Sequence, residues 1–199
     1  MQKKYRTLVL FGPPGSGKGT QGKILGAIPN LVHFSSGEAF RSLDPKSELG
    51  RTCKDYFDRG LLVPDELTIR LCVDHLDKSA RAGKINPATD SLLLDGIPRN
   101  VNQAQALAPT VEVKAVLNLA CANYEALVQR MKKRALKESR TDDADENVIR
   151  ERFQTYERQT KPLLEFYGPK LVRTVNALQS PLAVLRDIVN ILVKLEEGS

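Results

Sequence analysis

The chain has 199 residues, of which 41% are hydrophobic and 27% are charged, and these values favour one globular domain with a buried core. They exclude a largely disordered chain, and no apolar run approaches the ~20 residues that a membrane-spanning helix needs. The net charge of +6 is by itself compatible with nucleic acid, an anionic membrane or a small polyanion as the partner.

The distribution of charged residues and of cysteines narrows the choice of partner and of cellular compartment. Basic residues between Arg130 and Arg158 alternate with acidic ones and have few aromatic neighbours, which favours a solvated helical surface over a nucleic-acid groove. The apolar run 7–11 leads into a glycine-rich loop rather than a cleavage site, so we expect no signal peptide. Cys53, Cys72 and Cys121 are widely spaced, which argues against a disulfide framework or a zinc site. We therefore expect a cytoplasmic protein without a nucleic-acid or membrane partner.

The predicted elements alternate between strands and helices. Apolar runs predict strands at 7–11, 31–35, 91–95, 112–119 and 170–175. Helices are expected after the glycine-rich loop, over 36–59 with a break near Asp44-Pro45, from 64 onward, and over 124–137, 146–167 and 181–195. This alternation predicts a parallel sheet covered by helices on both faces.

The loop after the first strand has the spacing of a phosphate-binding P-loop, Gly12-x-x-x-x-Gly17-Lys18. Glycines let successive N–H groups point at phosphate oxygens, and the following helix adds its positive N-terminal end. Gly19 stands where the consensus has Ser or Thr, and Thr20 follows it. The motif predicts a nucleoside triphosphate site, and the lack of a visible Asn-Lys-x-Asp element argues against a switch GTPase.

Four segments together resemble the nucleoside monophosphate kinases, and among them the short-lid adenylate kinases: GPPGSGKGT at 12–20, SSGEAFR at 35–41, LDGIPRN at 94–100 and RTDD at 140–143. The resemblance implies a three-layer α/β P-loop NTPase fold with a parallel five-stranded sheet. It implies a core of residues 1–34, 64–132 and 144–199, a small helical monophosphate-binding lobe at 35–63 and a short lid at 133–143. The implied reaction is reversible, Mg²⁺-dependent phosphoryl transfer from ATP to AMP, giving two ADP, by a monomeric enzyme.

Elementary electrostatics agrees with this reaction. ATP and AMP bring together about six negative charges, and like charges ~4 Å apart repel by roughly 4 kcal/mol per pair at an intermediate dielectric constant. The acceptor is itself an ionised phosphate, so no general base is required. The reaction therefore predicts a site of fixed cations, for which the candidates are Lys18, Arg41, Arg99, Arg130, Arg134, Arg140 and Arg152.

The resemblance assigns these and other residues to subsites. The catalytic residues would be Lys18, Arg99, Arg140 and Arg152. ATP would be bound by Gly15, Ser16, Gly17, Lys18, Gly19, Thr20, Arg130, Arg134 and Gln179. AMP would be bound by Ser36, Gly37, Arg41, Leu61, Leu62, Val63, Gly96, Ile97, Pro98, Arg99, Gln103, Arg140 and Arg152. Asp95, at the end of a predicted strand, would hold hydrated Mg²⁺.

Three alternatives stay open from the sequence. Arg152 is chosen by its four-residue spacing to Tyr156, and Arg150 competes with it. The amide of Gln103 matches the hydrogen-bonding edge of adenine, whereas pyrimidine nucleotide kinases typically have Asn there, so a UMP/CMP kinase is the nearest rival function. A non-catalytic nucleotide-binding or RNA-associated module on the same fold is the other rival.

Overall fold

A computed structural model describes residues 4–138 and 140–197, and a five-stranded parallel sheet forms the centre of this part of the chain. The strands are β1 (Tyr5–Phe11), β2 (Leu31–Ser35), β3 (Ser91–Asp95), β4 (Val111–Ala120) and β5 (Val172–Asn176). Their order is β2-β3-β1-β4-β5, so β1 lies in the middle and pairs with both β3 and β4. The predicted parallel sheet is confirmed.

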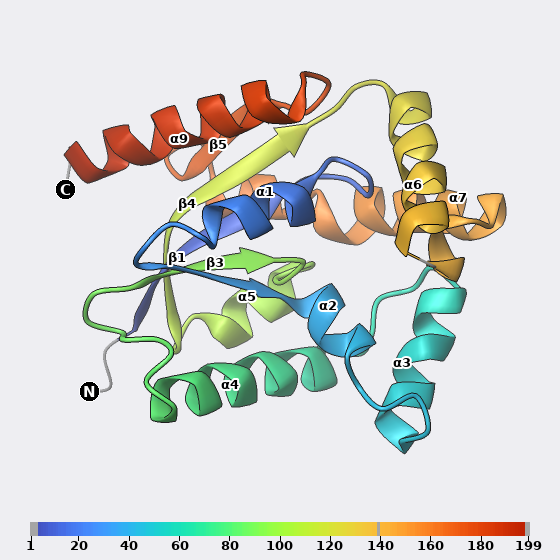
Figure 1. Ribbon diagram of the computed structural model, residues 1–199, viewed down its shortest axis with the longest axis horizontal. Helices are drawn as coiled ribbons and strands as arrows, with labels where there is room; N and C mark the ends of the chain where they lie inside the picture. The colour runs from blue at the N-terminus through green and yellow to red at the C-terminus, as the bar shows by residue number, and fades with distance from the viewer. Residues whose placement is uncertain (1–3, 139, 198–199) are drawn as a thin grey trace.

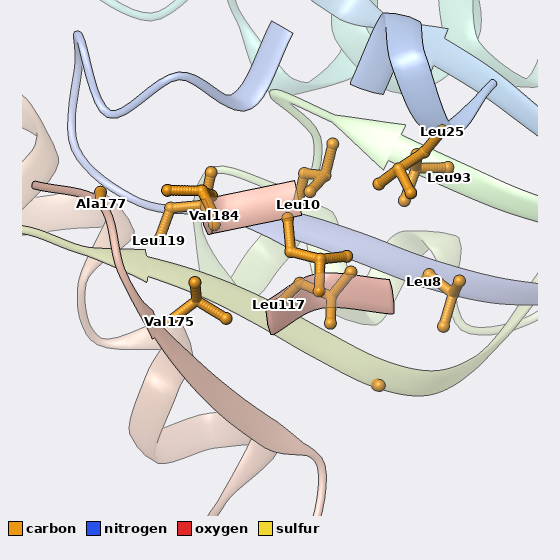
Figure 2. Packing of buried hydrophobic residues seen from close by; sticks show 11 residues of the cluster. Leu8, Leu10, Leu25, Leu93, Leu117, Leu119, Val175, Ala177 and Val184 are labelled. Carbon is orange, nitrogen blue, oxygen red and sulfur yellow. The ribbon is translucent and has the colours of Figure 1, made fainter. Parts of the chain in front are cut away.

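Helices cover both faces of the sheet and give the predicted three layers (Figure 1). On one face, α1 (Lys18–Leu25) and α9 (Pro181–Glu197) pack on alternate residues of β1 and β4. Figure 2 shows this cluster, in which Leu10 and Leu117 of the sheet meet Leu25 of α1 and Val184 of α9. The other face carries α4 (Asp65–Arg81), α5 (Val101–Leu107) and α8 (Leu163–Tyr167).

The remaining helices lie beyond the carboxyl ends of the strands, on the right of Figure 1. After β2 come α2 (Ser36–Arg41) and α3 (Glu48–Asp58), separated at the predicted break. They have a hydrophobic cluster of their own, around Phe40, Cys53 and Val63, which also includes Leu67 and Leu71 of α4. After β4 come α6 (Tyr124–Glu138), the short 3₁₀ helix η1 (Thr141–Asp143) and α7 (Glu146–Thr155).

The predicted helix over 146–167 is interrupted in the structure. It divides into α7, a π-helical turn η2 (Tyr156–Thr160) and α8. Pro162 explains the interruption, because it has no backbone N–H and its ring would clash with the carbonyl four residues earlier in a continuous α-helix. The π turn brings Tyr156 and Thr160 to the cleft described below.

The boundaries of the lobe at 35–63 and the lid at 133–143 stay predictions. In the structure α3 is in contact with η1, and Arg41 of α2 is paired with Asp142 of η1, so the two segments lie side by side. Across the described residues, no helix is both long enough and apolar enough to span a membrane.

Candidate active site

The glycine-rich loop joins β1 to α1 in the conformation that phosphate binding requires. Gly12, Gly15 and Gly17 all have positive φ. A Cβ on Gly15 would lie 2.8 Å from the backbone oxygen of Leu127, so the loop can pack against α6 only with glycine at this position. The loop therefore packs closely against α6 and leads directly into α1, whose N-terminal end favours a phosphate.

Lys18 bends back over this loop. Its Nζ donates hydrogen bonds to the carbonyl oxygens of Gly12, at 2.7 Å, and Pro13, at 3.0 Å. Burial, together with the positive charges of Arg99, Arg134 and Arg152, lowers the pKa of Lys18 to about 7 against the opposing effect of Asp95. A phosphate near Nζ would relieve this unfavourable setting.

Six of the seven predicted cations converge on one cleft at the carboxyl ends of the strands, between the P-loop, α2 and α7. The predicted site residues that line it are Gly15, Gly17, Lys18, Gly19, Gly37, Arg41, Leu62, Asp95, Gly96, Pro98, Arg99, Arg134, Arg140 and Arg152. Burial and the charge of Arg152 lower the pKa of Arg99 to about 10. Burial, together with Arg134 and Arg41, also lowers the pKa of Arg140. Burial first, and the neighbouring positive charges after it, therefore lower the pKa of even these guanidinium groups.

Two buried aspartates hold part of this cluster together. Asp143 accepts from Arg134 Nε at 2.6 Å and from Arg152 Nη1 at 2.5 Å. Asp142 accepts from Arg152 at 2.7 Å and from Arg41 at 3.0 Å, which joins α2 to η1 across the cleft. Burial raises the pKa of Asp143, but its bonds to the arginines outweigh burial and keep that pKa below its usual range.

Arg134 still has an unused donor. Its Nε is bonded to Asp143, whereas its Nη2 is buried and has no hydrogen-bond partner in the described structure. A buried donor without a partner is costly, so this nitrogen favours an anion in the cleft. Burial lowers the pKa of Arg134, yet the bond to Asp143 and the nearby acids raise it above its ordinary value.

A smaller pocket adjoins the cleft on the side of α2 and α3. The predicted site residues that line it are Ser36, Gly37, Leu61, Leu62, Val63, Gly96, Arg99 and Gln103. Phe40 and Phe57 complete an apolar wall suited to a flat base. Ser36 donates to the carbonyl oxygen of Gly96 at 2.7 Å, so its hydroxyl also fastens the lobe to the loop after β3.

Gln103 is 1% exposed, which excludes an exposed position on α5 for this side chain. Its Oε1 accepts from the backbone N–H of Arg99 at 2.7 Å, and its Nε2 donates to Asp65 Oδ1 at 2.8 Å. Asn100 caps α5 and donates to the same Asp65 carboxylate. The amide is therefore fixed by Asp65 of α4 and by the backbone of the loop after β3.

Asp95 ends β3 next to the P-loop, as predicted. Burial raises its pKa, but contact with the His33 imidazole and the charges of Lys18 and Arg99 outweigh burial and hold it below the usual range. A Cβ on Gly19 would lie 3.6 Å from Asp95 Oδ2, so the glycine at 19 leaves the carboxylate uncovered on that side. Asp95 is therefore an ionised carboxylate beside the phosphate loop, available as a ligand for a metal ion.

Five of the predicted ligand residues line neither cavity. Ser16 is buried within the loop, Thr20 is exposed, and Ile97 is fully buried in the core. Arg130 donates to the carbonyl oxygen of Ala177 at 2.7 Å, and Gln179 donates to Asp187 at 2.8 Å. Arg130 thus ties α6 to the segment after β5, and the nucleotide contacts of these five residues stay predictions.

The structure separates the two competing arginines on α7. Arg152 lines the cleft, whereas Arg150 is exposed in a groove on the outer side of α6 and α7. A two-residue step turns a helix by roughly 200°, so the two side chains occupy opposite faces. The position favours Arg152 as the clamp residue.

Sequence reasoning gave no role to three acids that shape the site: Asp65, Asp142 and Asp143. Asp142 and Asp143 belong to the RTDD motif, and their position beside Arg140 is the signal in the sequence that could have indicated them. Asp65 had none, because its partner Gln103 lies 38 residues away.

Comparisons with known proteins agree with this geometry. The profile of the adenylate kinase family matches residues 10–172. An adenylate kinase of Flavobacterium psychrophilum is 37% identical over 193 residues, covering 92% of this chain and 97% of the relative. An adenylate kinase of Cyanothece sp. is 39% identical over 196 residues, covering 95% of this chain and 96% of the relative. An adenylate kinase of Thermobifida fusca is 41% identical over 179 residues, covering 86% of this chain and 89% of the relative. A chain with this fold, this cation-lined cleft and these relatives belongs to the adenylate kinase family.

Proposed function

We propose how this chain's own residues carry out the reaction of its family, the reversible transfer of a phosphoryl group from ATP to AMP to give two ADP. The P-loop and Lys18 would hold the β- and γ-phosphates of ATP, and Arg134 would bind them from the lid side. Arg41 and Arg99 would hold the AMP phosphate. Arg140 and Arg152 would bind the group in transfer between them.

One observation carries this proposal: six of the seven predicted cations line one cleft, together with Asp95. Nucleotide kinases need little covalent help from the protein, because the acceptor phosphate is already ionised and the barrier is dominated by charge and position. Buried arginines placed where charge develops act through strong electrostatic interactions in a medium of low dielectric constant. The rival activities, a UMP/CMP kinase and a non-catalytic module, are not favoured, because the relatives are adenylate kinases.

The base would be selected in the pocket next to α3. Leu61, Leu62 and Val63 would pack on the ring of AMP, and the amide of Gln103 would bind its edge. On the ATP side, the residues at 176–179 and Arg130 would border the adenine, since Arg130 already fixes the carbonyl of Ala177.

The residues present fit a magnesium ion. Asp95 is ionised, lies beside the phosphate loop and is left uncovered by Gly19. In the described residues no group of three or more His, Cys, Asp or Glu is placed to hold a metal, and Mg²⁺ does not require one, because it keeps several waters and takes few carboxylates plus phosphates. When bound, the ion would neutralise phosphate charge, and Asp95 would hold it through water.

We also propose that residues 35–63 and 133–143 close over the substrates as a lobe and a lid. The ion pair between Arg41 and Asp142 supports this division, because it joins the two segments directly. Closure would exclude water that could otherwise accept the phosphoryl group.

A single chain supplies every group used in this scheme, which supports a monomeric enzyme. The free thiols of Cys53, Cys72 and Cys121 agree with a reducing compartment such as the cytoplasm.

The test is to mix the protein with Mg²⁺, ATP and, in turn, AMP, CMP, UMP or GMP, and to measure the diphosphates formed. We expect fast conversion with AMP and at least ~100-fold lower kcat/KM with the others, as is typical when a site hydrogen-bonds its substrate. Faster reaction with CMP or UMP would overturn the base assignment. Binding of ATP without formation of ADP in the presence of AMP would overturn the enzyme assignment.

A further inference from the structure

A glutamine amide cannot by itself choose between two purines. Adenine presents an amino donor at position 6 and an acceptor at N1, whereas hypoxanthine presents an acceptor at position 6 and a donor at N1. Because the Gln side chain carries an acceptor oxygen and a donor NH₂ at nearly the same place, a rotation of the amide by half a turn converts one pattern into the other. A site that reads the base through Gln103 therefore discriminates only if something prevents this rotation.

The surroundings of Gln103 supply that constraint. Its Nε2 lies 2.8 Å from Asp65 Oδ1, and its Oε1 lies 2.7 Å from the backbone nitrogen of Arg99. A carboxylate can only accept, and a backbone N–H can only donate. The rotated amide would face an oxygen with its oxygen and a donor with its nitrogen, and would lose both hydrogen bonds in a site where Gln103 is 1% exposed.

Asp65 is itself held in place. It lies in the first turn of α4, where the positive end of the helix favours an acid. Its carboxylate also accepts from Asn100 Nδ2, at 2.8 Å to Oδ1 and 3.1 Å to Oδ2, and Asn100 caps the helix that carries Gln103. Asp65, Asn100 and the Gln103 amide therefore form one hydrogen-bond network between α4 and α5. Within this network Gln103 uses one amide N–H and one lone pair of its oxygen, so the other N–H and the other lone pair are available to a base.

We propose that Asp65 is a positioning residue that sets substrate choice by fixing the Gln103 amide in the orientation that accepts adenine and rejects 6-oxopurines. Asp65 touches no nucleotide in this scheme and acts through Gln103. The inference rests on the proposed function, because it takes Gln103 as the residue that binds the base of AMP. It adds an acid that determines which purine monophosphate is phosphorylated.

The test compares kcat/KM for AMP with kcat/KM for IMP, which differ at position 6 and in the protonation of N1. Asp65→Leu replaces the carboxylate acceptor by an apolar side chain of similar size. Asp65→Ser shortens the side chain but keeps a polar group at the start of α4. We expect the AMP:IMP ratio to fall at least ~10-fold in both variants, with the KM for ATP within ~3-fold of that of the parent. Glu66→Leu is the matched control, since it removes an exposed acid from the same helical turn, and its ratio should stay within ~2-fold of the parent's.

Gln103→Leu separates this inference from the proposed function. If Gln103→Leu lowers the AMP:IMP ratio and the two Asp65 variants leave it unchanged while retaining turnover, the role of Asp65 is overturned and Gln103 remains the base-reading residue. If Gln103→Leu itself leaves the ratio unchanged, the assignment of the base pocket fails as well. Circular dichroism melting of each variant identifies one that has not folded, and the second Asp65 variant then decides the result.

Discussion

Two cations on the core side of the cleft and two on the lid side are held in opposite electrostatic settings. On the core side, Lys18 and Arg99 are buried next to other positive charges, and the pKa of each is lowered, to about 7 and about 10. On the lid side, Arg134 and Arg152 are paired with Asp143 at 2.6 and 2.5 Å, and the pKa of Arg134 is raised. The first pair lacks sufficient counter-charge in the protein, and the second pair carries its own.

This difference suggests two separate tasks. A cation with insufficient counter-charge gains most when a phosphate arrives, so Lys18 and Arg99 are suited to bind and stabilise transferred charge. A cation fixed by a buried acid gains less from the phosphate, but its position is already set when the substrate binds.

Removal of a core-side cation has the largest expected effect. Arg99→Ala deletes a guanidinium that lines both the cleft and the base pocket, and we expect kcat/KM for AMP to fall about 10³-fold. A coupled assay of ADP formation measures it. Arg150→Ala, on the exposed outer face of α7, is the control and should stay within ~2-fold of the parent. Activity within a few-fold in Arg99→Ala would remove Arg99 from the proposed machinery.

Removal of a lid-side counter-charge affects stability first. The Asp143 side chain is fully buried between Arg134 and Arg152, and Asp143→Asn leaves both guanidinium groups with less negative charge nearby. We expect a loss of about 2 kcal/mol, or roughly 5 °C in melting temperature for a chain of this size. Inorganic triphosphate should restore more of this loss in the variant than it adds to the parent, because it replaces the missing anion.

The matched control for that experiment is Asp55→Asn. Asp55 pairs with Arg59 on the exposed face of α3 at 3.4 Å, so its loss should change the melting temperature by ~1 °C or less. If Asp143→Asn melts like this control, the lid-side arginines do not depend on a protein counter-charge and the comparison fails on that side.

A proton balance tests the core side without removing a cation. With a pKa of about 7, Lys18 in the free protein is mostly neutral at pH 8, and a bound polyphosphate would raise that pKa and charge the amine. ATP binding at pH 8 should therefore take up about one proton, measured by titration calorimetry in buffers of different ionisation enthalpy. Lys18→Arg stays charged throughout and should lack this uptake; equal uptake in both proteins would contradict the assignment to Lys18.

The sequence was sufficient for features encoded within a short stretch. The P-loop spacing predicted the turn, the helix and the place of Lys18, and the apolar runs predicted all five strands to within two residues at each end, because backbone preference and burial act locally. The position of Asp95 at the end of β3 followed from the same local pattern. These residues needed no knowledge of what packs against them.

The remaining parts of the site depend on contacts between distant segments. Asp142 meets Arg41 across 101 residues, and no local pattern signals such a pairing. The same holds for the burial of Gln103, which is determined by α4 and by the loop after β3 rather than by α5 itself. The choice between Arg150 and Arg152 was different, because the four-residue spacing from Arg152 to Tyr156 is a local pattern, and both of these residues line the cleft.

The smallest expected effect is a difference of about 1 kcal/mol in the free energy of unfolding between two glycine variants, and it concerns the contact between the lobe and α7, which carries Arg152. Gly60 follows α3 with φ +69°, and a Cβ there would lie 2.8 Å from the carbonyl oxygen of Val148. Gly83 has nearly the same φ, +67°, but open space around it. Gly83→Ala should therefore lower the free energy of unfolding by about 1 kcal/mol through backbone strain alone. Gly60→Ala should lower it by about 1 kcal/mol more than Gly83→Ala does, because α7 must also move. Urea unfolding measures both, and equal losses would show that the lobe does not press on α7 at this point.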